Sequence, residues 1–183
     1  MKRRRYYGLI SVAFMLLTAQ TAPAQEGVNN ALPRGFRNIT LGLEYETAER
    51  QVSADTAFAF RGQPDVSIAL SDGEPLIDTR GRGYVDRGVF SFYENRLFSI
   101  SLYLSTQRLD YLQMYNQLAG KYGDPTDLDP RRAVWDDGVT RIELERPLTV
   151  RYLDVTVFER RRDTQRAAEA VEDMTRRQFL ELF

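Results

Sequence analysis

The sequence predicts an α+β fold in which helices pack on one face of a mainly antiparallel sheet. Apolar residues recur at helical spacing in three segments, near residues 44–52, 106–122 and 160–183. Between these segments, runs of strand-like alternation follow one another through short turns. Because strands succeed strands without a helix between each pair, this order indicates an antiparallel sheet and disfavours the regular strand-helix alternation of parallel folds.

The first 24 residues are typical of an export signal. Residues 2–5 are basic, residues 8–19 are apolar, and the small residues at 22–24 supply a cleavage site. We therefore expect the mature chain to be periplasmic or secreted after cleavage near Ala24. An uncleaved N-terminal anchor is the alternative.

The composition of the remaining chain limits its function. Removing the four basic residues of the signal leaves 21 basic and 26 acidic residues, a formal charge of −5, which disfavours nucleic-acid binding. No later segment approaches the roughly 20 apolar residues of a membrane-spanning helix, so no stable membrane span is expected after cleavage. The chain has no cysteine for disulfides or lipid attachment. Residues 25–35 predict a flexible leader, and residues 36–158 have the size of a single domain.

In the first half, a helix precedes a meander of strands. The helix is expected over about residues 44–52, where Tyr45, Ala48 and Val52 fall on one face. Alternating apolar residues then predict short strands at 56–60, 66–70 and 76–79.

The strongest local signal is the stretch VFSFYENRLFSISLYL, residues 89–104. Its alternation predicts two strands of a hairpin joined by Glu94-Asn95-Arg96. In the second strand, one face is expected to carry Phe98, Ile100, Leu102 and Leu104.

The second half repeats this order. A helix capped by Ser105 or Thr106 is expected to end at Gly123, with Pro125 beyond it. Strands follow at 133–135 and 139–145 around an Asp137-Gly138 turn, and a last strand at 148–158 has a bulge near Leu153-Asp154. Residues 40–104 and 105–158 therefore resemble two degenerate copies of a helix followed by a meander.

Residues 159–183 predict a C-terminal helix. Ala167, Val171 and Met174 form one stripe, and the apolar end contains Phe179, Leu182 and Phe183. Two interpretations stay open, because the helix either docks on the sheet or extends and binds a partner.

The candidates for catalysis are few. The chain has no histidine and no cysteine, which removes the usual general base, zinc ligand and thiol nucleophile. Paired carboxylates hydrolyse glycosides in some enzymes, and the chain offers Asp136 with Asp137, and Glu143 with Glu145. However, the aspartates belong to a predicted turn, and the glutamates share one face of a strand, as solvated residues do. We expect no enzyme, no catalytic residue and no cofactor.

The acidic loop KYGDPTDLDP, residues 121–130, is a candidate calcium site. Counted from Asp124, its carboxylates fall at positions 1, 4 and 6, and position 12 is Trp135. A helix-loop-helix calcium loop needs ligands at positions 1, 3 and 5 and a glutamate at 12. The loop is therefore interpreted as a helix stop, with no metal site, and Lys121 as a surface residue in the last helical turn.

Three surface features are candidates for binding. Tyr84, Tyr93 and Tyr103 are expected on the strand face opposite the core, and tyrosine is a common interface residue. Burial of that face under the tail helix is the alternative. The segment at 80–84 is interpreted as a mobile loop, and the arginines at 160–162 as pairing locally with Glu159 and Asp163.

Two motifs carry a resemblance to known proteins. They are Ile39-Thr40-Leu41-Gly42-Leu43 before a helix, and Leu118-Ala119-Gly120-Lys121-Tyr122-Gly123-Asp124-Pro125 before a strand bearing Trp135. Together they resemble small uncharacterised exported envelope proteins and, more distantly, the accessory lipoproteins of outer-membrane protein assembly (SmpA/OmlA type). The resemblance implies helices on a small antiparallel sheet, although this chain lacks the acylated cysteine.

The function expected from the sequence is that of a non-catalytic periplasmic protein-binding or scaffold domain of the cell envelope. Its expected partner is another envelope protein. A small carboxylate-based hydrolase and a carrier of a small apolar ligand are the alternatives.

Overall fold

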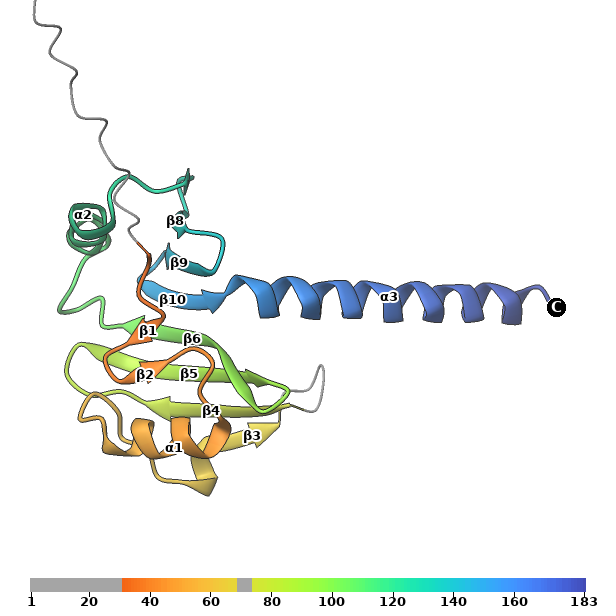
Figure 1. Cartoon of the computed structure of the whole chain (residues 1–183), viewed down its shortest axis with the longest axis horizontal. Coiled ribbons are helices and arrows are strands. Elements are labelled where there is room, and N and C mark those ends of the chain that lie inside the picture. The colour runs from red at the N-terminus through yellow and green to blue at the C-terminus, as the bar shows by residue number, and fades with distance from the viewer. Residues whose placement is uncertain (1–30, 69–73) are drawn as a thin grey trace, which may run out of the picture.

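A computed structural model of the chain describes residues 31–68 and 74–183 (Figure 1). Over these residues the chain forms an antiparallel sheet with three helices, which confirms the predicted α+β fold. The helices are α1 (Tyr45–Ala54), α2 (Tyr111–Tyr122) and α3 (Val155–Leu180), and a short 3-10 turn, η1, spans Gln63–Asp65. A two-stranded hairpin is formed by β1 (Gly35–Phe36) and β2 (Ile39–Thr40). The main sheet contains, in spatial order, β3 (Val66–Ile68), β4 (Pro75–Arg80), β5 (Val85–Tyr93), β6 (Arg96–Leu104), β10 (Thr149–Asp154), β9 (Thr140–Glu145), β8 (Arg132–Asp136) and β7 (Asp127–Leu128).

The main sheet consists of two similar halves. In each half a helix is followed by four antiparallel strands, which are β3 to β6 after α1 and β7 to β10 after α2. The halves join where β6 pairs antiparallel with β10, with Ile100 opposite Tyr152. The helix-and-meander order predicted for the two halves is therefore the order observed.

One face of the sheet carries the hydrophobic core. Ala48 and Val52 of α1, Leu118 of α2 and Ile39 of the β1–β2 hairpin belong to the same buried cluster as Ile100 at the centre of the sheet. Both helices therefore cover the same side, which we call the helical face. We call the other side the open face.

Trp135 fixes the end of α2 to the sheet. Its buried indole donates a hydrogen bond from Nε1 to the carbonyl oxygen of Gly123 at 2.9 Å. Gly123 has a φ of +81° as the residue that ends α2, as its glycine predicts. The helix begins at Tyr111 with Asp110 as its cap, because the Asp110 carboxylate accepts the Gln113 N–H at 2.8 Å. The predicted cap at Ser105 or Thr106 is wrong.

The predicted strand at residues 56–60 is also wrong. Asp55 ends α1 and turns the chain, since its side chain accepts the Ala57 N–H and its carbonyl accepts the Phe58 N–H. Phe58 makes only a single bridge to Gly81. Its ring is buried edge-on against Phe90, with 5.3 Å between ring centroids. The aromatic alternation thus reflects core packing and not a strand.

The β5–β6 hairpin is confirmed, but a bulge changes the face of one residue. Ser99 lies opposite Ser91, whereas Leu97 lies opposite Phe92, so Phe98 is the extra residue. Leu97 therefore joins Ile100 in the core cluster, which does not include Phe98. The prediction that Phe98 and Ile100 share a face is wrong.

The last predicted strand ends earlier than expected. β10 ends at Asp154, and α3 begins at Val155. The Asp154 carboxylate accepts the Val157 N–H at 3.1 Å and caps the helix. The change of phase near Leu153 and Asp154 therefore marks the start of a helix, and the predicted bulge there is wrong.

The domain also begins before Phe36. Leu32 is buried, and its N–H donates to Asp137 Oδ2 at 2.8 Å. Arg34 forms an ion pair with Asp154. Residues 32–35 thus belong to the domain, while the predicted signal and residues 25–30 of the predicted leader lie outside the described residues. Within the described ranges, no helix has the length and apolar content needed to cross a membrane.

Candidate functional site

The open face is the first candidate site. α1 and α2 pack on the helical face, and α3 leaves the end of β10 and runs away from the sheet (Figure 1). Residues alternate between the two faces of a strand, so Ser91 of β5, Ser99 and Ser101 of β6 and Arg151 of β10 project on the open side.

Small side chains make the middle of the open face concave. A hollow of about 290 Å³, the central hollow, is lined by Ser91, Phe98, Ser99, Ser101, Glu143, Arg151, Leu153, Phe158 and Arg161. A second hollow of about 210 Å³ shares Glu143 and extends toward β7 and β8. Phe98 is in the central hollow because of the bulge, and Phe158 and Arg161 come from the first turns of α3.

An ion-pair network spans the central hollow. Arg151 Nη1 lies 3.0 Å from Glu143 Oε2, and Arg151 Nη2 lies 3.7 Å from Glu145 Oε2. Arg151 Nε donates to Ser101 Oγ at 3.2 Å. The two glutamates share a face as predicted, but Glu143 is only 8% exposed and is not a solvated residue. One guanidinium compensates both carboxylates.

The second predicted carboxylate pair lies in the β8–β9 turn. Asp136 pairs with Arg141 at 2.8 Å. Asp137 accepts the N–H groups of Val139 at 2.9 Å and Thr140 at 2.7 Å. Burial acts to raise the pKa of Asp137, but the N–H donations from Thr140, Leu32 and Val139 outweigh it and hold the pKa below its ordinary value. These aspartates stabilise the turn, as predicted.

The carboxylates of the acidic loop after α2 pair with the nearby arginine Arg132. Asp127 and Asp129 both face Arg132, at 3.4 Å and 3.2 Å. The pKa of Asp129 is lowered first by the N–H of Arg131 and also by the N–H and guanidinium of Arg132. Lys121 lies 5.4 Å from the ring centroid of Tyr122. Among the described residues, no three acidic side chains gather in a way that suits a metal ion.

The predicted tyrosines are not together. Tyr103 lies on the open face with the Arg87 guanidinium 5.3 Å from its ring centroid, and Tyr93 is half-buried at the hairpin end of β5. Tyr84 lies in the β4–β5 turn and is exposed. This turn is tied down by backbone bonds from Arg82 N to Ala57 O and from Ser105 N to Tyr84 O, both of 2.9 Å or less.

Helix α3 contacts the sheet only through its first turns. The Arg161 guanidinium lies 5.3 Å from the ring centroid of Phe98, and Arg160 lies 3.9 Å from Glu94 of the hairpin loop. Local pairing is confirmed for Arg162 with Glu159 and with Asp163. From Asp163 to the end of the chain every residue is exposed. Of the two interpretations, the extended helix is the one observed, and burial of the open face under the tail does not occur.

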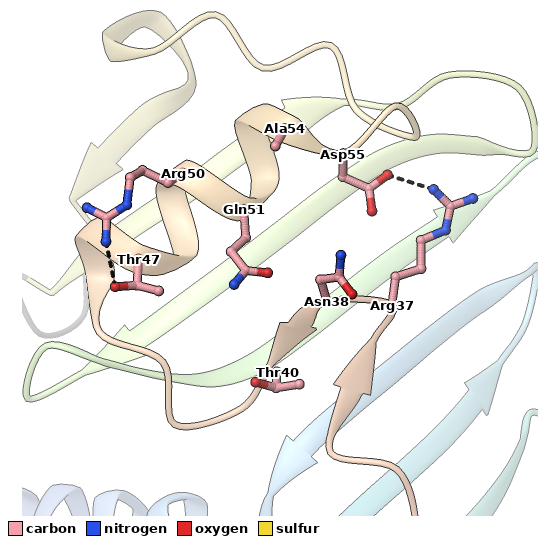
Figure 2. A pocket seen from close by; sticks show the side chains of 8 residues that line it. All are labelled: Arg37, Asn38, Thr40, Thr47, Arg50, Gln51, Ala54 and Asp55. Atoms are coloured by element: carbon pink, nitrogen blue, oxygen red, sulfur yellow. Dashed lines mark hydrogen bonds and ion pairs between the residues drawn. The ribbon is translucent and has the colours of Figure 1, made fainter.

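A third depression lies on the helical face between the β1–β2 hairpin and α1, and has a volume of about 660 Å³. Figure 2 shows its polar lining, in which Arg37 pairs with Asp55 at 2.7 Å and Arg50 donates to Thr47 at 2.9 Å. Asp55 is the sole carboxylate of this lining and also accepts the Ala57 N–H. The depression therefore offers no pair of acids.

Residues 34–164 match the family model of the TP0088 domain. The chain belongs to the TP0088 domain family. The TP0088 match covers both halves of the sheet and the first turns of α3, and it ends where α3 has left the sheet. No curated protein and no solved structure matches the chain. The resemblance to the SmpA/OmlA type of lipoprotein gains no support from these comparisons.

The sequence pattern singled out Glu143 but missed the other residues that build the central hollow. Ser99 and Ser101 alternate with large apolar residues in β6, and Arg151 is a charged residue flanked by the apolar Val150 and Tyr152 in β10. A small or charged residue in a strand that is otherwise apolar is the signal that points to them. Their juxtaposition depends on the β6–β10 pairing, which joins segments 50 residues apart.

Proposed function

We propose that this protein is a non-catalytic protein-binding or scaffold domain of the bacterial cell envelope, and that it holds another envelope protein through α3. The observation that carries the proposal is the exposure of α3. Its apolar residues Val171, Met174 and Phe179 are 55–60% exposed, and Leu182 and Phe183 are more exposed still.

An isolated helix of this kind needs a partner to cover its apolar side. Helix α3 has 26 residues, which corresponds to about 39 Å at 1.5 Å per residue. Helices in proteins owe most of their stability to the packing of an apolar face, and no residue of α3 is buried. An envelope protein with an apolar groove would cover the stripe of Ala167, Val171 and Met174, as amphipathic helices are commonly bound.

Ion pairs along α3 keep its other side polar. Arg176 lies 3.3 Å from Glu172 and 3.2 Å from Asp173. Pairs at this spacing add a few tenths of a kcal/mol each and favour the helical conformation. The helix is thus amphipathic in a form suited to a protein groove.

The open face supports a second area of contact for the same partner. It starts at the base of α3, and it presents Arg151 and Phe158 in the lining of the central hollow and the exposed Tyr103 further along β6. Arginine and tyrosine are enriched at energetically important interface positions. Periplasmic or secreted localisation, expected from the signal-like N-terminus, fits a partner in the envelope.

A non-catalytic role is favoured by the state of the candidate carboxylates. Glu143 and Glu145 share Arg151, Asp127 and Asp129 share Arg132, and Asp137 is held by backbone N–H groups. Each is committed to an ion pair or a turn. A carboxylate hydrolase is therefore the weaker alternative.

Site-specific crosslinking tests the proposal. A photoreactive residue at Val171 of the full-length chain is expected to yield one defined adduct in intact cells. The matched control is the same residue at Glu169, on the opposite side of the helix, which is expected to yield none. In reconstitution with the purified adduct partner, Val171→Glu with Met174→Glu should weaken binding at least about tenfold.

Two results would contradict the proposed function. One is equal crosslinking from positions 171 and 169. The other is a purified monomer that hydrolyses a glycan with a rate that falls when Glu143 is replaced by glutamine.

A further inference from the structure

A cleft on the helical face differs in character from the depressions described above. It has a volume of about 680 Å³ and lies at the junction of the two halves. Its floor is apolar and draws on segments that are distant in the chain, through the residues Phe36, Ala57, Val85, Leu104, Leu109 and Met114. Its rim holds Arg37, Arg82, Arg108 and Tyr84. We call this the arginine cleft.

The charges at this cleft are of one sign. Three arginines line it, and no carboxylate does. Arg37 is neutralised by Asp55 at 2.7 Å. Arg82 and Arg108 are exposed, and neither forms an ion pair with any residue in the described ranges 31–68 and 74–183. Within these ranges, two positive charges thus lie beside an apolar floor without a compensating carboxylate.

The backbone around the floor is already paired. Arg82 N donates to Ala57 O at 2.8 Å, Ser105 N donates to Tyr84 O at 2.9 Å, and Leu109 N donates to Ser105 O at 3.0 Å. A peptide bound in extended form would need backbone partners that these groups no longer offer, whereas a hydrocarbon chain needs none. The floor therefore favours an acyl chain over an extended peptide.

The geometry points to a ligand site: we propose that the arginine cleft binds an acyl chain with an anionic head group, a carboxylate or a phosphate. The chain lies on the floor formed by Val85, Leu104 and Met114, and the head group pairs with Arg82 and Arg108. The volume lies within the range of about 300–1,000 Å³ typical of small-molecule sites. This site is on the helical face and makes no use of α3, so it stands or falls independently of the proposed function.

Calorimetric titration of the mature full-length chain tests the proposal with defined probes. Dodecanoate and dodecyl phosphate, each below its micelle concentration, are expected to bind one to one. Dodecyl maltoside, which has the same tail and a neutral head, should bind at least about tenfold more weakly, and the affinity for dodecanoate should fall as salt is raised. Lysophosphatidylglycerol is the further probe. Tighter binding of lysophosphatidylglycerol than of dodecanoate assigns the ligand as a phospholipid, and tighter binding of dodecanoate assigns it as a free fatty acid.

Variants separate the head-group contact from the fold. The double variant Arg82→Gln with Arg108→Gln should weaken dodecanoate binding roughly tenfold, because each exposed ion pair contributes up to about a factor of five in affinity. The same variant should leave the binding of dodecyl maltoside unchanged. Both residues are exposed and form no ion pair with the described part of the chain, so the variant is expected to fold. Arg131→Gln removes an exposed arginine elsewhere and is the matched control. The exposed Thr56 also lines the arginine cleft, and Thr56→Trp should block every probe.

The proposal is overturned if dodecanoate and the maltoside bind with equal affinity. It is equally overturned if the double arginine variant binds dodecanoate as the wild type does, or if no probe binds to the folded protein.

Discussion

Deleting residues 163–183 should leave the stability of the domain unchanged. From Asp163 onward every side chain is exposed, and the contacts of α3 with the sheet are made by Phe158, Arg160 and Arg161. The removed segment therefore contributes no buried or half-buried side chain to the domain. The expected shift in Tm is within about 2 °C of zero.

A docked helix would behave very differently. Burying one large apolar side chain stabilises a protein by about 1.5–3 kcal/mol, and the segment contains six such side chains that are exposed. Docking them would stabilise the domain by on the order of 10 kcal/mol. Because 1 kcal/mol changes the Tm by about 2–4 °C in a protein of this size, the truncated form would then melt far lower.

The assay is thermal unfolding followed by circular dichroism, on chains that begin at the same residue and end at 183 or 162. The truncated form should lose helical signal without a change in Tm. Leu118→Ala in α2 serves as the sensitive control, because Leu118 is 6% exposed and its loss should cost about 2–5 kcal/mol. A fall of 5 °C or more on truncation would show that α3 packs on the domain and would refute the reasoning.

Three further changes test the interior and the open face. Gly88→Ala places a Cβ 2.6 Å from Phe58 Cε1, so the free energy of unfolding measured in urea titrations should fall by about 1–3 kcal/mol. If this clash is the cause, adding Phe58→Leu should restore part of the lost stability. Asp137→Ala should destabilise the protein by about 1 kcal/mol at pH 7. Folding lowers the pKa of Asp137, so the stabilising effect of its carboxylate is present above the unfolded pKa of about 3.9 and is lost as the pH falls through the lower folded pKa. The difference in Tm between the Asp137→Ala variant and the wild type should therefore shrink below about pH 4. A difference that stays constant with pH would contradict this. Arg151→Met should cost about 2 kcal/mol because it leaves the buried Glu143 unpaired, while Arg151→Met with Glu143→Leu should lie within about 1 kcal/mol of wild type; equal losses in the two variants would argue against the ion pair.

Local signals in the sequence determined the main elements. The alternation around Glu94 and Asn95 specifies the β5–β6 hairpin, because pairing of neighbouring strands through a short loop needs no distant partner. Gly123 followed by Pro125 fixes the end of α2 for the same reason, since a left-handed residue and a proline act on their own helix. These signals are enough for the α+β class and for the repeated order of the two halves.

Pairing between distant segments decided which way side chains face. Phe98 has the spacing of a core residue, and only the register against β5 shows that it is the bulged residue on the open face. The sequence from Val155 to Phe158 is rich in strand formers, yet the pairing of β10 with β9 ends at Asp154 opposite Thr140, and Asp154 then caps a helix. Strand propensity does not prevail where no partner strand is present.

Both candidate sites were likewise beyond the reach of the sequence. The central hollow needs Ser101 and Arg151 side by side on strands that are distant in the chain, and the arginine cleft needs Arg82 and Arg108 from different halves. The sequence by itself determined the elements, the absence of imidazole and thiol chemistry, and the amphipathic tail. Only the tertiary structure decided that α3 projects from the sheet and that Arg82 and Arg108 lie beside the apolar floor of the arginine cleft. The physical reason is that burial and charge pairing depend on neighbours that folding brings together.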